Sequence, residues 1–243
     1  MKQTHKSLLT ISMFALTSST FSQNLLSNGN FELGNVGFTS GYTYSPGSNQ
    51  NQGDYAVLSN PNPWNPGAYS MPDHTSGAGL MMAINGSSVS SSVVWRAVVS
   101  VQPGSAYSFA GWDASWGELS GGGTDPSPAA LRISINGTQL GDTTASGQDG
   151  QWSQFSFAWN SAANTQATIE IRDLNTAFLG NDFALDDLSF ASVPEPSSLG
   201  LIVAFGALVS VRRARNKGSR CLPRHENRCS SLEYIPVRRA PAH

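Results

Sequence analysis

Lysine is absent from the central part of this 243-residue chain, residues 24–192. Three arginines are the only residues there with a permanent positive charge, and thirteen aspartates and glutamates give the region a formal charge of −10. Binding of a phosphate backbone needs a basic surface, so this region is not expected to bind nucleic acid.

Cysteine is absent from the same region, because Cys221 and Cys229, the two in the chain, both lie near the C-terminus. A disulfide within residues 24–192 is therefore excluded. The region must be held by its hydrophobic core, with a bound metal as a further candidate. Its length is sufficient to bury one such core.

A helical period of 3.6 residues is also missing from this region. Apolar and polar residues instead alternate in short runs separated by Gly, Asn and Pro, which is typical of half-buried strands. In "ALRISING", Leu131, Ile133 and Ile135 share one face. Seven or more such runs predict an all-β sandwich. The runs cover residues 80–84, 93–101, 107–109, 131–135, 155–159, 169–172 and 188–190.

Two Asn-Gly pairs follow strand-like runs, at Asn85-Gly86 and Asn136-Gly137. Asn-Gly readily adopts the positive φ angles of a tight hairpin, so both pairs predict hairpin turns. Each pair also begins a glycosylation sequon, which is the alternative interpretation.

Residues 1–23 have the order of a secretory signal peptide. Lys2 and Lys6 come first, a mostly apolar stretch from Leu8 to Leu16 follows, and small polar residues end the segment. We therefore expect export through the Sec translocon. The alternative is a disordered or helical N-terminus of a cytosolic protein.

A short apolar run near the C-terminus, residues 197–211, lies between two prolines and an arginine cluster. As a helix it would be about 22 Å long, and a stable membrane span usually needs about 20 residues. We expect a marginal transmembrane helix whose arginines hold its end on the cytoplasmic side. A buried core helix is the alternative, but the run lacks an amphipathic pattern.

The segment 193–215 combines a Pro-Glu-Pro triplet, this apolar run and the arginine cluster. Its defining residues are Pro194, Glu195, Pro196, Arg212, Arg213 and Arg215. Together they resemble the PEP-CTERM sorting signal of bacterial exported proteins. The resemblance implies a transient inner-membrane anchor, cleavage near the triplet by an exosortase-type membrane protease, and transfer of the body to the cell surface or extracellular matrix. Such signals normally end soon after the arginines, whereas here a basic tail, residues 216–243, follows and is expected to be disordered.

The body, residues 24–192, carries a second resemblance. "NLLSNGNFELG" and "GNDFALDDLSF" resemble the opening and closing strands of galactose-binding-like jelly rolls, a group that includes many carbohydrate-binding modules. The resemblance implies a jelly-roll β-sandwich with a structural calcium ion where the first and last strands meet. The implied carboxylate ligands are Glu32, Asp186 and Asp187.

Calcium prefers such hard oxygen ligands. Alternation also puts Asp186 on the face of Leu188 and Phe190, where an unpaired carboxylate would be costly and a cation would resolve the cost. The alternative is that these acids are solvated at the ends of strands.

Three of the six tryptophans are candidate carbohydrate-binding residues, because aromatic faces can stack on sugar rings. Trp64 and Trp116 lie in loop-like sequence and could be exposed, and Trp112 precedes Trp116 closely. Packing in the core or in loops is the alternative for each of them.

No set of catalytic residues is evident, and we do not expect an enzyme. His74 is the only histidine of the body and lies in a loop, and nothing specifies the separation of Asp113 and Glu118, which could otherwise act as paired glycosidase carboxylates. The sequence therefore favours an exported protein with a structural or adhesive role in an extracellular polymer matrix. A carbohydrate-binding module that recognises an extracellular polysaccharide is the alternative.

Overall fold

The computed structural model describes residues 22–48, 51–117 and 123–194. The chain divides into two units, residues 1–195 and 196–243. Most of the expected signal peptide, Glu195 and Pro196, the apolar run, the arginine cluster and the basic tail lie outside the described residues. Within the described residues, no helix has the length and apolar character needed to cross a membrane.

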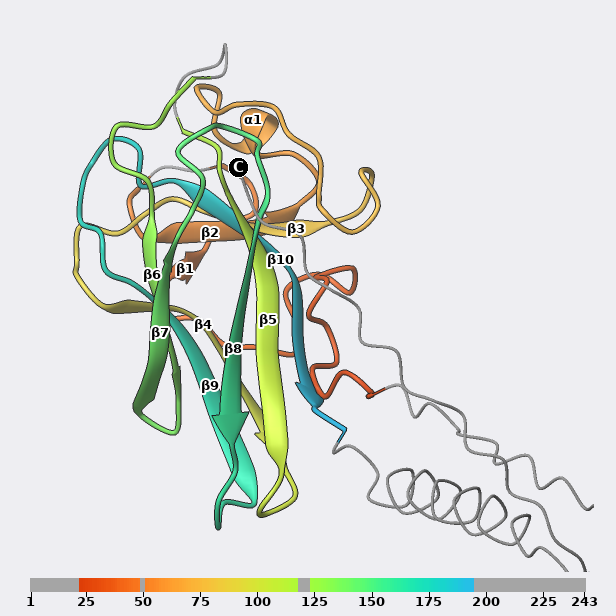
Figure 1. Cartoon of the computed structure of the whole chain (residues 1–243). Helices are drawn as coiled ribbons and strands as arrows, with labels where there is room; N and C mark the ends of the chain where they lie inside the picture. The colour runs from red at the N-terminus through yellow and green to blue at the C-terminus, as the bar shows by residue number, and fades with distance from the viewer. Residues whose placement is uncertain (1–21, 49–50, 118–122, 195–243) are drawn as a thin grey trace, which may run out of the picture. The chain divides into compact units, whose positions relative to one another are not determined.

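The described residues form a sandwich of two β-sheets, which confirms the all-β prediction (Figure 1). The larger sheet has the order β1 (Thr43–Tyr44), β2 (Asp54–Leu58), β3 (Met81–Ile84), β10 (Phe183–Ser192), β5 (Ala106–Ser115), β8 (Ser153–Asn160). The smaller sheet has the order β4 (Ser92–Ser100), β9 (Gln166–Asp173), β6 (Ala130–Ile135), β7 (Thr138–Thr144). The short helix α1 (Pro61–Trp64) follows β2.

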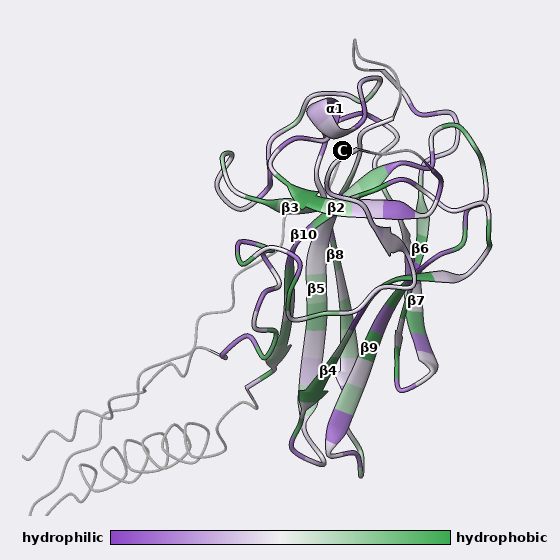
Figure 2. Cartoon of the chain, turned by 180° about the vertical axis from the view of Figure 1, so that it is seen from behind, coloured by the Kyte–Doolittle hydropathy of each residue, from purple (hydrophilic) through white to green (hydrophobic). Residues whose placement is uncertain are grey.

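The main core lies between the two sheets. Leu131, Ile133 and Ile135 of β6 are fully buried there, as their alternation predicts. Hydrophobic and hydrophilic bands alternate in the same way along β9 (Figure 2). In β4 the alternation changes phase, because the register with β9 shifts between Val93 and Trp95. This bulge buries Val94 as well as Trp95, whereas strict alternation places Val93 on the buried face.

Of the two hairpin turns predicted at Asn-Gly pairs, the structure contains one. Asn136 and Gly137 join β6 to β7 with φ angles of 51° and 77°, so the predicted hairpin is confirmed. Asn85-Gly86 follows β3, but the next strand, β4, belongs to the other sheet. The hairpin predicted at Asn85-Gly86 is therefore wrong.

A second, smaller hydrophobic cluster lies on the other face of the larger sheet. It contains residues of the sheet, such as Met81 and Ala114, together with residues of α1 and the segment that follows it. Adjacent residues in β3 and β10 face the main core instead, for example Met82 and Leu185. The central strands of the larger sheet are thus buried on both faces.

The N-terminal segment closes the sandwich against the last strand. Leu188 donates its backbone N–H to Gly29 O at 2.8 Å, and Leu25 donates to Phe190 O at 2.8 Å. In Figure 1 this red segment runs beside β10. A Cβ atom at Gly29 would lie 1.8 Å from the carbonyl oxygen of Leu188, so only glycine permits this close approach.

Gly29→Ala should therefore destabilise the protein, since the backbone of Leu188 must move to admit the methyl group. We expect a loss of about 1–3 kcal/mol in the free energy of unfolding, measured by urea denaturation. Gly47→Ala is the matched control, because nothing lies within 4 Å of a Cβ at that position. Equal denaturation midpoints for the two variants would contradict this account of the junction.

Candidate functional site

The last strand contains a bulge that sets the geometry of the site. The register of β10 against β5 shifts between Asp186 and Ser189, and Asp187 has a φ angle of 47°. A left-handed conformation is uncommon for a residue other than glycine, and such outliers cluster at functional sites. Within this bulge the side chain of Asp186 is fully buried, while that of Asp187 is 29% exposed.

The buried Asp186 carboxylate is surrounded by hydrogen-bond donors. One of its oxygens accepts the backbone N–H groups of His74 at 2.9 Å and Thr75 at 3.1 Å. The other accepts the backbone N–H of Asp187 at 2.7 Å. Burial raises the pKa of Asp186 to about 6, although these hydrogen bonds act in the opposite direction. The carboxylate thereby fastens the segment 73–80 to the sheet.

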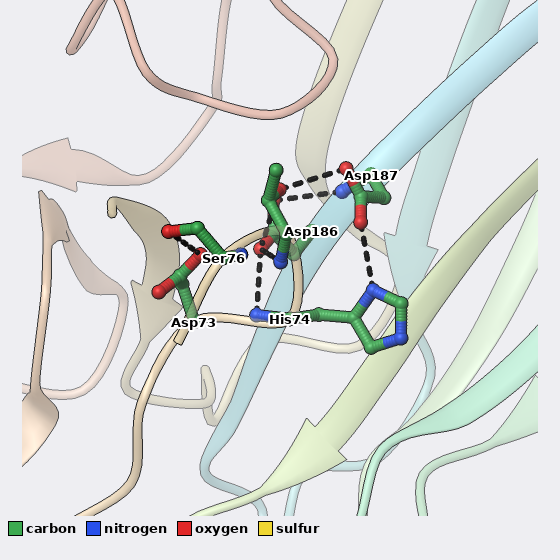
Figure 3. A network of polar contacts seen from close by, with 6 residues as sticks. Asp73, His74, Ser76, Asp186 and Asp187 are labelled. Atoms are coloured by element: carbon green, nitrogen blue, oxygen red, sulfur yellow. Dashed lines mark hydrogen bonds and ion pairs between the residues drawn. The ribbon is translucent and has the colours of Figure 1, made fainter. Parts of the chain in front are cut away.

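Two further carboxylates hold the same segment, one of which, Asp73, is drawn in Figure 3. Asp73 accepts the backbone N–H groups of Ser76 and Gly79, each at 2.7 Å. Burial acts to raise the pKa of Asp73, but these hydrogen bonds outweigh it and lower the pKa below its usual value. Glu32, from the N-terminal segment, accepts the backbone N–H of Leu80 at 3.0 Å. The segment is therefore fixed at both of its ends.

This fixed segment places His74 between an acid and two tryptophans. His74 Nδ1 lies 2.7 Å from Asp187 Oδ2, and the other Asp187 oxygen accepts the hydroxyl of Thr75 at 2.8 Å. The His74 ring stacks on Trp112 with centroids 3.9 Å apart and an interplanar angle of 21°. It meets Trp152 edge to face, with centroids 5.6 Å apart. We call His74, Trp112 and Trp152 the aromatic cluster.

An open groove lies beside the aromatic cluster, and Asp187, which contacts His74, forms part of its lining. The groove has a volume of about 360 Å³ and polar side chains along much of its wall. Its lining residues are Asn24, Leu26, Ser27, Gly29, Asn30, Asp187, Leu188 and Ser189. It forms where the N-terminal segment meets the bulge of β10, and its volume falls within the range of small-ligand sites.

Trp64 and Trp116 are packed in the interior, which is the alternative interpretation of their sequence, so the suggestion that they are exposed to bind a sugar is wrong. Both belong to the smaller hydrophobic cluster, where Trp64 is 4% exposed and Trp116 is fully buried. Their indole N–H groups donate to backbone carbonyls, of Ser45 and Phe183 respectively, each at 2.6 Å. Neither ring presents a face to solvent, so of the three candidates only Trp112 lies in the candidate site.

The three expected calcium ligands contact protein groups, and Asp186 and Asp187 share one of them, the hydroxyl of Thr75. Asp186 faces N–H donors, Asp187 contacts His74 and Thr75, and Glu32 contacts Leu80. A carboxylate that is surrounded by N–H groups acts as a hydrogen-bond acceptor, and such surroundings do not suit a cation ligand. Over the described ranges, no group of three or more His, Cys, Asp or Glu side chains has an arrangement that could hold a metal ion. These contacts do not fit calcium ligation by the three acids together, and that expectation stays a prediction.

Sequence reasoning did not identify two members of the site, His74 and Trp152. A lone loop histidine is expected to be solvated, and the partner of His74, Asp187, lies 113 residues away along the chain. The one local signal was the pair Asp186 and Asp187, which interrupts the alternation of the last strand. That interruption marks the bulge but does not indicate what packs against it.

No model of a protein family matches this chain, and no curated protein matches it. Several solved structures are similar. TmCBM61 in complex with β-1,4-galactotriose is 14% identical with a TM-score of 0.46, over 71% of this chain and 100% of that one. The CBM22 tandem domain of Xyn10C from Paenibacillus barcinonensis is 13% identical with a TM-score of 0.46, over 73% and 48%.

A Stig cyclase from Fischerella sp. TAU has a similar score. It is 9% identical with a TM-score of 0.49, over 72% of this chain and 99% of that one. A carbohydrate-binding module and a cyclase thus match to similar degrees. At these TM-scores the similarity does not decide a ligand.

Proposed function

We propose that the chain is a carbohydrate-binding domain whose site consists of the aromatic cluster and the groove beside it. One observation carries the proposal: Asp187 contacts His74 of the aromatic cluster and also lines the polar groove. A sugar ring has an apolar face, which packs on aromatic rings, and a rim of hydroxyl groups, which bond to carboxylates and amides. The site offers both kinds of surface next to each other.

A neutral polysaccharide is the expected ligand class. The body has a formal charge of −10, and its three arginines lie on β4, β6 and β9 of the smaller sheet. The candidate site, in contrast, is built on the N-terminal segment, the segment 73–80, β5, β10 and the residue before β8, and it contributes a carboxylate. A polyanion would be repelled by such a surface.

Trp112→Ala should weaken binding to neutral polysaccharides by about tenfold, equivalent to about 1.4 kcal/mol, since it removes the ring on which His74 stacks. Binding of the purified chain is measured on a glycan array and then by titration with the polysaccharide selected. Phe178→Ala is the matched control, because Phe178 is a 70% exposed aromatic residue that belongs neither to the aromatic cluster nor to the groove.

The control should bind like the wild-type chain, with circular dichroism showing that both variants are folded. The proposal is wrong if the wild-type chain binds no glycan, or if Trp112→Ala and Phe178→Ala bind equally well.

We further propose that this domain works outside the cytoplasm, at the cell surface or in the extracellular matrix, in a structural or adhesive role. The support is the order of the sequence features: a signal-like N-terminus, an acidic body without cysteine, and the PEP-CTERM-like segment. On this proposal the Sec translocon exports the chain, the apolar run anchors it transiently, and an exosortase-type protease removes the sorting segment.

Mass spectrometry of the native protein tests this route. The mature chain should begin near residue 24 and end near Pro194–Pro196, and replacement of the triplet Pro194, Glu195 and Pro196 by alanines should leave the C-terminus uncut. An intact chain that ends at His243 and accumulates in the cytosol with its leader attached would contradict the proposed route.

A further inference from the structure

A pair of buried acids lies outside the candidate site, where two short segments meet. Asp125 donates its backbone N–H to Gly147 O at 2.7 Å, and Asp149 donates to Gly123 O at 3.2 Å. The side chains of both acids point inward, since Asp125 is 4% and Asp149 is 5% exposed. Both segments lie close to the end of β5, because Gly150 donates to Ser115 O at 2.8 Å.

The side-chain oxygens at this place have few partners. Within the described part of the chain, neither carboxylate oxygen of Asp125 accepts a hydrogen bond, nor does Asp149 Oδ1. Asp149 Oδ2 accepts the backbone N–H of Gly123 at 3.1 Å. Ser115 Oγ is fully buried and also has no hydrogen-bond partner among the described residues.

These oxygens are neighbours. Burial and, next, the negative charge of Asp149 raise the pKa of Asp125 to about 6, while the nearby Ser115 hydroxyl and the backbone N–H of Gly117 lower it. The Asp125 carboxylate also lies against Gly117, where a Cβ atom would be 1.9 Å from Asp125 Oδ1. Two carboxylates and a hydroxyl therefore converge at the end of β5.

Among the described residues, no positively charged side chain pairs with these two acids. The body has no lysine, and its three arginines pair with other acids: Arg96 and Arg172 with Glu170, and Arg132 with Asp142. Burial of a charged group without a partner is costly unless the group is neutralised or binds a cation. Two carboxylates carry the charge that one divalent cation balances.

We propose that Asp125, Asp149 and Ser115 form a calcium site that ties the two segments to the end of β5. The available side-chain ligands are all oxygens, which suit a hard cation and exclude the thiolate and imidazole sets of zinc. Calcium accepts a flexible set that backbone carbonyls and water complete, whereas magnesium requires near-ideal octahedral geometry. This site is distinct from Glu32, Asp186 and Asp187, and it does not depend on the proposed carbohydrate function.

Calcium titration of the purified full-length chain, first treated with chelator, tests this proposal. The melting temperature of the wild-type chain should rise on addition of calcium, with one calcium ion bound here by isothermal titration calorimetry. Asp125→Asn and Asp149→Asn keep the size of the side chain but remove a charged ligand. Each should abolish most of the rise and weaken calcium binding by about tenfold or more.

Two control variants distinguish this site from calcium bound elsewhere on the chain. Asp142→Asn removes an exposed carboxylate that pairs with Arg132, and it should leave the calcium response unchanged. Glu32→Gln should also leave it unchanged, whereas loss of the response in Glu32→Gln and not in Asp125→Asn would place calcium at the first and last strands and overturn the proposal.

The proposal is also overturned if calcium does not raise the melting temperature of the wild-type chain. If the Asp variants fail to fold, Ser115→Ala provides a milder change, because it removes one neutral ligand from the set. It should lower the calcium affinity severalfold, and an unchanged affinity would contradict a site that includes Ser115.

Discussion

The candidate site depends on a carboxylate that is buried and must therefore find hydrogen-bond donors. Asp186 is fully buried in the central strand of the larger sheet, and the backbone N–H groups of His74 and Thr75 satisfy it. A segment that connects α1 to β3 is thereby fixed on the sheet. The position of His74 on Trp112, and its contact with Asp187, follow from that attachment.

The buried acids of this acidic body differ in how their burial is compensated. Asp173 accepts hydrogen bonds from Tyr42 and Asn181, each at 3.0 Å, while Asp186 accepts backbone N–H groups. Asp113 has no hydrogen-bond partner among the described residues, and burial raises its pKa to about 7, so near neutral pH much of it is uncharged. Asp125 has a second acid, Asp149, beside it, which is why a cation is proposed there and not at Asp113.

Local pattern was sufficient to predict the fold class, but not the site. The alternation of Leu131, Ile133 and Ile135 and the Asn136-Gly137 turn are properties of neighbouring residues, and the structure confirms both. β7 was missed because its residues are mostly exposed and polar, so it shows no alternation.

The errors at the site have a common physical cause. Trp64 and Trp116 lie in sequence that looks like loop, yet they pack edge to face with centroids 6.0 Å apart in the smaller cluster. The contact between His74 and Asp187 likewise joins residues far apart in the chain. Such contacts depend on how the segment after α1 folds over the sheet, and no local pattern encodes that arrangement.

The most direct test of the central claim is hydrogen–deuterium exchange at the backbone amides of His74 and Thr75. Both amides should be protected in the wild-type chain and should exchange about tenfold faster or more in Asp186→Ala, because their acceptor is gone. Amides of the ladder between β5 and β8, such as those of Phe109 and Phe157, should keep their rates. Equal exchange of His74 and Thr75 in the two proteins would show that Asp186 does not hold this segment.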